Sequence, residues 1–243
     1  MPICQLCKND RKLIKAHIIP RAFWRLPQAD KDAAKIISNT AGSWPKTTRI
    51  GVYDEEILCE ACDGKLGVLD QHATESLLQC GPSETFKMNG ASVGRIYGAA
   101  DPKILTKFIA SVAWRAAVSQ QDFFKSVALG TYENTIALWL NDSCSAPAGI
   151  RAVLAEFDVA QVPMLDPHQT RDEGVRFWVI YADRFIFYMQ ADKRTMSEPM
   201  RLRALEAGKP VTSIVRSWHN SKERRILIKI AQSNPGAFRR INR

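Results

Sequence analysis

Cys4-Gln5-Leu6-Cys7 and Cys59-Glu60-Ala61-Cys62 are the two short motifs that organise the N-terminal part of this chain. Each motif carries two thiols separated by two residues, and two such pairs can supply the four sulfur ligands of a tetrahedral Zn²⁺ site. The first pair has the composition of a tight knuckle, and the second opens a segment of helical character. A knuckle and a helix joined by one metal ion form a treble clef. The sequence therefore predicts a treble clef with structural zinc held by Cys4, Cys7, Cys59 and Cys62.

Two other uses of these cysteines stay open at this stage. The pairs could form disulfides, or one of them could be a redox-active Cys-x-x-Cys motif. A redox motif does not need a second copy, and no βαβ pattern surrounds either pair. The two remaining cysteines, Cys80 and Cys144, are expected to be ordinary buried or half-buried thiols.

Length and composition place the chain among folded globular proteins. It has 243 residues, of which 46% are hydrophobic and 24% charged, enough for one large or two small domains. The apolar run Phe177–Met189 is interrupted by Asp183 and Arg184, so no segment reaches the roughly 20 residues that span a bilayer. The start of the chain shows no apolar leader. We therefore expect no membrane partner and a cytoplasmic location.

The charge balance favours a polyanionic partner. The formal net charge is +9, and Lys and Arg are concentrated in residues 8–25 and from Arg216 onward. Such clusters are typical of surfaces that contact phosphates. Trp218-His219-Asn220 lies in the second cluster and could stack on bases, although a strand edge followed by a solvated charged tail explains this segment as well.

The residues between the two cysteine pairs contain a histidine in a distinctive setting. Lys15-Ala16-His17-Ile18-Ile19-Pro20-Arg21 predicts a short strand that leads into a turn, and Arg49–Tyr53 predicts a second strand before the second cysteine pair. Taken alone, His17 is better explained as a core or capping histidine.

These motifs together resemble the treble-clef, ββα-metal nucleases of the HNH type. In that family a Cys-x-x-Cys knuckle precedes a His-Ile-x-Pro motif and then an Asn-Leu-x-x-Leu-Cys-x-x-Cys-His segment. The matching elements here are Cys4–Cys7, His17-Ile18-Ile19-Pro20 and Asp54–Asp63. Gly51-Val52-Tyr53 and Asp70 also match a diverged bacterial subgroup. The resemblance covers roughly residues 1 to 80 and implies an endonuclease.

The resemblance implies roles for individual residues. His17 would be the general base that activates water, and Asp54, in the place of the family's Asn, would orient it. Asp63, in the place of the family's final His, would bind Mg²⁺ or Mn²⁺. Lys15 and Arg21 would contact phosphates and stabilise the transition-state charge.

The chain departs from the family pattern at Ala16, which occupies the position of a metal-ligating Asp or His. Helical periodicity places Asp63, Gly67 and Asp70 on one face, so Asp70 could help Asp63 to hold the cation. The alternative is that Asp63 caps or begins the helix and that Asp70 is a solvated charge.

The remainder of the chain predicts a mixture of helices and strands. Asp101-Pro102 predicts the start of a helix that continues to about residue 117, and a second helical pattern covers 123–140 with an interruption at Gly130. A strand is expected around 153–157, and 175–181 and 185–190 predict a hairpin. Residues 163–174 are expected to form a long loop in which His168 is exposed.

The fold class expected is α+β: a zinc treble-clef domain over residues 1–95, and an α+β region over residues 96–243 containing helices and a β-hairpin. The function expected from the resemblance is metal-dependent hydrolysis of phosphodiester bonds in nucleic acid, DNA in preference to RNA. The alternative is a non-catalytic zinc module that binds nucleic acid or a protein partner, because Ala16 removes a ligand. A protein partner or self-association is compatible with either.

Overall fold

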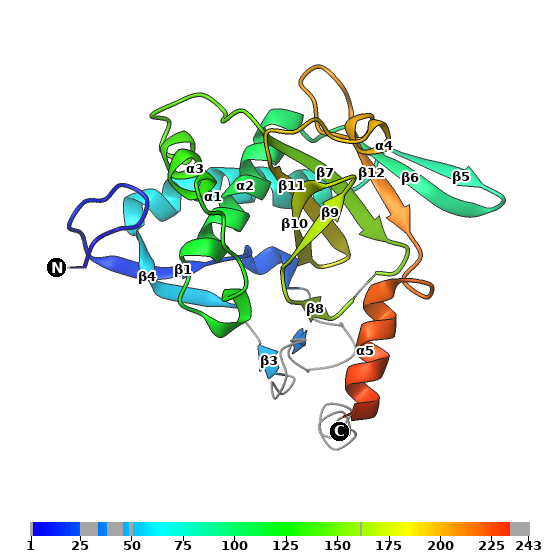
Figure 1. The fold of residues 1–243 in the computed structure, drawn as a ribbon, viewed down its shortest axis with the longest axis horizontal. Coiled ribbons are helices and arrows are strands. Elements are labelled where there is room, and N and C mark those ends of the chain that lie inside the picture. The colour runs from blue at the N-terminus through cyan, green and yellow to red at the C-terminus, as the bar shows by residue number, and fades with distance from the viewer. Residues whose placement is uncertain (1, 25–33, 38–45, 49–50, 161, 234–243) are drawn as a thin grey trace.

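The computed structural model describes residues 2–24, 34–37, 46–48, 51–160 and 162–233 (Figure 1). Its α-helices are α1 (Glu60–Ala73), α2 (Pro102–Val118), α3 (Tyr132–Leu140), α4 (Glu198–Arg201) and α5 (Lys222–Ser233). Its strands are β1 (Leu13–His17), β2 (Ala34–Ile37), β3 (Lys46–Thr48), β4 (Tyr53–Cys59), β5 (Glu84–Met88), β6 (Ala91–Tyr97), β7 (Ile150–Phe157), β8 (Met164–Leu165), β9 (His168–Asp172), β10 (Val175–Ala182), β11 (Phe185–Ala191) and β12 (Val211–Arg216). Short helical turns are η1 (Arg21–Phe23), η2 (Thr74–Gln79) and η3 (Asp122–Phe124).

The strands form three sheets. The largest has the order β5-β6-β12-β7-β11-β10-β9, and its pairs are antiparallel except for the parallel pair β12–β7. β1 and β4 form a separate antiparallel ribbon, while β2 pairs with β3 and β8. The chain is therefore α+β, as the sequence predicts.

One face of the large sheet packs against α2. Asp101 caps this helix by accepting hydrogen bonds from the backbone N–H groups of Lys103 and Ile104 at 2.7 and 3.0 Å, and Pro102 occupies its first turn. The Phe108 ring lies edge-to-face on Phe187 of β11, with centroids 5.6 Å apart. Its other neighbour is Phe23 of η1, stacked at 5.7 Å. The three rings join the N-terminal residues to the sheet in one continuous core.

A buried glutamate ties β6 to the centre of the sheet. Glu156 of β7 is fully buried and accepts hydrogen bonds from Tyr97 and Arg184, each at 2.9 Å, and also from Arg95 and Ser213. Because β6 pairs with β12 and contributes Arg95 and Tyr97 to this network, the domain boundary expected at residue 95 falls inside a strand of the large sheet.

Several local expectations are confirmed and others are wrong. The helices starting near Cys59 and at Pro102, the break near Gly130, and the 175–190 hairpin are all present. The strand expected at 49–53 instead runs over Tyr53–Cys59, with residues 49–50 outside the described ones. The loop expected at 163–174 contains β9, which pairs with β10. The expectation that His168 is exposed is wrong, because in β9 it is half-buried and its ring stacks on Tyr181. Cys80 and Cys144 were expected to be buried or half-buried, and this is wrong, because both are exposed. In the part of the chain that the structure describes, no helix is long and apolar enough to cross a bilayer.

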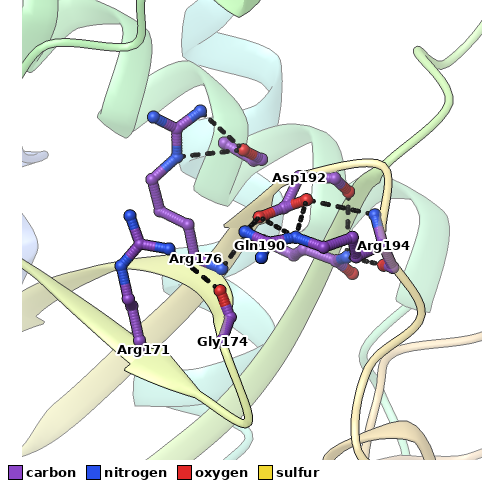
Figure 2. Close-up of polar contacts among 7 residues, drawn as sticks. Arg171, Gly174, Arg176, Gln190, Asp192 and Arg194 are labelled. Atoms are coloured by element: carbon purple, nitrogen blue, oxygen red, sulfur yellow. Dashed lines mark hydrogen bonds and ion pairs between the residues drawn. The ribbon is translucent and has the colours of Figure 1, made fainter.

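A polar network fixes the exit of the chain from β11 (Figure 2). Asp192 accepts hydrogen bonds from the Arg194 side chain, at 3.0 Å from Nε to Oδ1 and 2.5 Å from Nη2 to Oδ2. Its Oδ2 also accepts from the backbone N–H of Arg176 in β10, at 3.1 Å. Gln190 donates to the backbone oxygens of Asp192 and Arg194 at 2.9 and 2.7 Å. The turn after β11 is thereby held against the start of β10.

This network predicts a pH dependence of stability. Hydrogen bonds from the Arg194 side chain and backbone hold the pKa of Asp192 below its usual range. Below the ordinary Asp pKa of about 3.9, Asp192 binds a proton in the unfolded chain but not in the folded chain. The stability of the folded state therefore decreases as the pH falls. Asp192→Asn should therefore lose less Tm than the wild type between pH 5 and 2. Equal Tm losses in the two proteins would contradict this role.

Candidate functional site

The two cysteine pairs meet at one point. The four sulfur atoms of Cys4, Cys7, Cys59 and Cys62 all lie within 4.8 Å of one another. Cys59 is the last residue of β4, and Cys62 lies in the first turn of α1. Three of the thiols are buried and that of Cys7 is half-buried. These four cysteines are close enough to hold a metal ion.

Backbone hydrogen bonds shape the turn that carries the first cysteine pair. The Cys4 N–H donates to the Asn9 oxygen at 3.0 Å, and the Lys8 N–H donates to the Cys4 oxygen at 2.9 Å. Lys8 has a φ of +58°, the left-handed conformation that closes the turn. The Gln5 N–H reaches the Ile57 oxygen of β4 at 2.8 Å, so the turn is held against the strand that ends in Cys59.

Hydrogen bonding and burial shift the pKa values of two of the thiols, Cys4 and Cys62, in opposite directions. Burial opposes ionisation of Cys4, but backbone N–H groups of Cys7, Cys59 and Leu6 outweigh it and lower the pKa of Cys4 to about 7. The Cys59 N–H lies 3.4 Å from the Cys4 sulfur. Burial, together with hydrogen bonding to Cys59 and Cys4, raises the pKa of Cys62. Cys4 therefore ionises more readily than Cys62, and a bound cation would supply charge that favours ionisation of Cys62.

His17 ends β1, whose first residue, Leu13, pairs with Cys59. His17 pairs with Tyr53 of β4, and the two rings lie edge-to-face with centroids 6.2 Å apart. Its backbone oxygen accepts a hydrogen bond from Arg115 Nη1 at 2.9 Å. The imidazole is half-buried, and His17 has a minor effect that opposes the burial-driven rise in the pKa of Asp63. His17 and Asp63 are thus close enough to influence each other.

The Asp54 side chain is hydrogen-bonded to residues at the end of α2. Asp54 pairs with Ala16, and side chains of paired residues share a face of the ribbon, whereas His17, the next residue along, faces the other way. Asp54 is buried and its Oδ2 accepts from the Ser119 hydroxyl at 2.8 Å and the Gln120 N–H at 2.9 Å. Its carboxylate therefore joins β4 to the end of α2.

Asp70 of α1 is held by a buried arginine of α2. Arg115 is 1% exposed, and it donates to Asp70 through both nitrogens, at 2.8 Å from Nη1 to Oδ2 and 2.7 Å from Nη2 to Oδ1. Arg115 Nη2 also lies 3.3 Å from the Ser111 hydroxyl. Asp70 is therefore not a simple solvated charge, because both of its carboxylate oxygens accept hydrogen bonds from Arg115.

Asp63 is the carboxylate with the more suitable environment for a ligand. It is half-buried on α1, and burial raises its pKa, although Arg115 acts in the opposite direction. Asp70 raises the pKa further and His17 lowers it. The structure thus brings Asp63, Asp70 and His17 into one electrostatic neighbourhood around Arg115.

Lys15 and Arg21, the predicted phosphate contacts, both reach solvent. Lys15 Nζ lies 3.8 Å from the centroid of the Tyr53 ring and 3.7 Å from Glu55 Oε1. The ring hydroxyl of Tyr53 and the Glu55 carboxylate raise the pKa of Lys15. Arg21 is the exposed first residue of η1. Lys15 thus lies on the same face of the ribbon as His17.

Arg115 is the residue of this site that the sequence analysis missed. Its signal is its spacing: it follows Phe108 by seven residues and Ser111 by four, on the apolar face of α2. A basic residue at such a position indicates a buried ion pair, although its partner is far away in sequence.

In comparisons with known proteins, no family model, no curated protein and no solved structure matches the chain.

Proposed function

We propose that this chain is a nucleic-acid endonuclease of the HNH type, with a treble clef built around zinc. The observation that carries the proposal is the cysteine cluster, which joins the Cys4–Cys7 turn, the end of β4 and the start of α1. The electrostatic effect of His17 on Asp63 supports it as well. Four cysteine sulfurs are the donor set typical of structural zinc. The net charge of +9 suits a nucleic-acid substrate.

In this proposal His17 is the general base. A neutral imidazole at the half-buried end of β1 accepts a proton from a water molecule as the water attacks phosphorus. Arg115 holds the His17 carbonyl oxygen and therefore fixes the end of the strand that carries the base. Lys15, on the same face, and Arg21 bind the phosphates that flank the scissile bond.

The residues present can supply one protein ligand to Mg²⁺ or Mn²⁺. Both oxygens of Asp70 are engaged by Arg115, and Ala16 has no donor, which leaves Asp63 as the proposed protein ligand. A divalent cation held by one carboxylate, waters and substrate phosphate oxygens is common in phosphoryl chemistry. When bound, such an ion would neutralise charge that develops on the phosphate.

A binding module without catalysis is the second candidate, and two observations favour it. Ala16 is fully buried, and Asp54 is bonded to the end of α2 rather than placed on the His17 face. A protein that keeps the zinc site and the basic surface would then bind nucleic acid or a protein partner without cutting.

Cleavage assays separate the two candidates. Purified protein is incubated with supercoiled plasmid and with single-stranded RNA in Mg²⁺, Mn²⁺ or EDTA. We expect metal-dependent plasmid cleavage, weaker RNA cleavage, and a loss of at least ~100-fold in His17→Ala, because a general base contributes about 10²–10⁴-fold. His72→Gln is the matched control and should cleave normally, because His72 is half-buried like His17 and its Nε2 accepts a hydrogen bond from the Asp101 N–H.

Two results would contradict the nuclease. One is cleavage by His17→Ala at the wild-type rate. The other is a folded, zinc-loaded wild type that shifts DNA in a gel and leaves it intact, which would make the chain a binding module.

A further inference from the structure

A groove of about 400 Å³ lies where the first turns of α2 meet α1 and α3. α2 packs against both of these helices, and Figure 1 shows the three together. Leu69 of α1, Ile104 of α2 and Trp139 of α3 supply most of the apolar wall, and Leu205, in the loop that follows α4, completes it. The volume of the groove lies in the range of about 300–1,000 Å³ that is typical of small-molecule sites.

The apolar wall of the groove stays in contact with water in the folded chain. Ile104 is 36% exposed, and Leu69, Trp139 and Leu205 are half-buried at the edge of the core. α2 contributes to the core through other residues, among them Phe108. Because the removal of apolar surface from water is favourable, an occupant with an apolar body would gain affinity from this wall.

Two lysines of α2 also line the groove. Lys103 and Lys107 are one helical turn apart, so their side chains lie on the same face of the helix. Lys107 donates to the Asp142 carboxylate, and Asp142 also pairs with Lys65 at 3.3 Å from Nζ to Oδ2. Within the part of the chain that the structure describes, Lys103 forms no ion pair. The positive charge of the three lysines therefore exceeds the single negative charge of Asp142.

Both ammonium groups that line the groove keep hydrogen-bond donors for an occupant. An ammonium has three N–H donors; Lys107 gives one of them to Asp142, and Lys103 is exposed and gives none to the described residues. The described residues that line the groove include no Asp or Glu, and the adjacent Glu206 pairs with Lys209 at 2.6 Å. An anionic group that accepts hydrogen bonds therefore fits beside the two lysines.

We propose that this groove binds a small amphipathic carboxylate, with its apolar body against Trp139 and its carboxylate at Lys103 and Lys107. A neutral apolar molecule would gain nothing from the two ammonium groups, and a small inorganic anion would gain nothing from the apolar wall. One negative charge matches Lys103, the lining lysine that has no acidic partner among the described residues. The groove contains neither His17 nor the clustered cysteines, so the proposal stands apart from the proposed nuclease activity.

Calorimetric titration of the full chain tests the proposal. The probe is octanoate, and the comparison compounds are butanoate, 1-octanol and octylammonium. We expect octanoate to bind at least ~10-fold more tightly than butanoate, because each further buried methylene is worth about fourfold in affinity. Octanoate should also bind more tightly than 1-octanol and octylammonium, because neither of these presents a negative charge to Lys103 and Lys107.

Two pairs of variants locate the binding site. Ala146→Trp fills the groove and should weaken octanoate binding by ~10-fold or more, whereas Ala148→Trp changes an exposed alanine outside the groove and should leave binding unchanged. Lys103→Gln should weaken octanoate binding by about 2- to 5-fold, as expected for one exposed ion pair, and should leave 1-octanol binding unchanged. Lys125→Gln, which changes an exposed lysine outside the groove, is its matched control.

Two-dimensional NMR gives an independent readout of where octanoate binds. The indole N–H signal of Trp139, identified by its loss in Trp139→Phe, should shift when octanoate is added. Three affinity results would overturn the proposal: octanoate that binds no better than butanoate, octanoate that binds no better than 1-octanol or octylammonium, or full octanoate affinity in Ala146→Trp. Octanoate-dependent shifts confined to the indole signals of other tryptophans would overturn it as well.

Discussion

Cys4→Ser is expected to abolish zinc binding and to lower the Tm by roughly 10 °C or more. Cys4 is fully buried at the centre of the four-sulfur cluster, and its sulfur accepts a hydrogen bond from the Cys59 N–H. Structural zinc sites contribute about 10–16 kcal/mol of apparent binding energy at pH 7, and that energy stabilises the fold. Loss of a few kcal/mol shifts the Tm of a chain this long by about 2–4 °C per kcal/mol.

The measurement is metal content by mass spectrometry together with thermal unfolding. Wild-type protein should carry about one zinc ion per chain, as a four-cysteine site requires. Cys144→Ser is the matched control, because Cys144 is exposed and lies outside the cluster. A strong chelator should lower the Tm of the wild type and of Cys144→Ser alike. Zinc retained by Cys4→Ser with an unchanged Tm would show that the cluster is not a metal site.

Asp70→Ala is expected to destabilise the protein by about 3–5 kcal/mol. The substitution leaves the guanidinium of Arg115, which is 1% exposed, without its charged partner, and an uncompensated buried charge is costly. Because Arg115 also holds the carbonyl oxygen of His17, the end of β1 should loosen as well. Urea unfolding followed by circular dichroism measures the change in the free energy of unfolding.

Asp142→Ala is the matched control for this prediction. Asp142 pairs with Lys65 and Lys107, but its side chain is 62% exposed, so its loss should change stability by about 1 kcal/mol or less. The double variant Asp70→Ala, Arg115→Met should recover part of the lost stability, because no unpaired charge remains. Equal effects of Asp70→Ala and Asp142→Ala would contradict the assigned role of the buried pair.

The features predicted from the sequence depend on neighbouring residues. The spacing of the cysteines within each pair indicates a metal site. Asp101-Pro102 predicts the start of α2, because a cap and a first-turn proline act within one helical turn. The apolar and aromatic runs at 175–181 and 185–190, separated by Ala182–Arg184, indicate the β10–β11 hairpin. In each case a few residues along the chain suffice to define the structure.

The features missed depend on partners distant in sequence. β9 lies in a segment rich in turn residues and becomes a strand because β10 offers it a free edge. β5 was not predicted, because Phe86 and Met88 are too short an alternation to indicate a strand; all five of its residues are exposed, and it forms by pairing with β6. α5 was interpreted as a charged tail, and its buried residues Glu223 and Leu227 acquire partners once the sheet is formed.

The residues of the candidate site fall into the same two groups: those that the sequence predicts and those whose role depends on distant partners. The sequence by itself predicted that the four cysteines meet, because their residue type and spacing express their chemistry. His17 and Asp63 were selected through the family resemblance, and their roles stay predictions. Only the tertiary structure decided that Asp54 bonds to the end of α2 and that Asp70 pairs with Arg115. A carboxylate looks the same in the sequence whether it binds a metal, caps a turn or neutralises a buried arginine. Its role depends on which donors the fold brings within hydrogen-bonding distance, and those donors here lie 45 and 65 residues away along the chain.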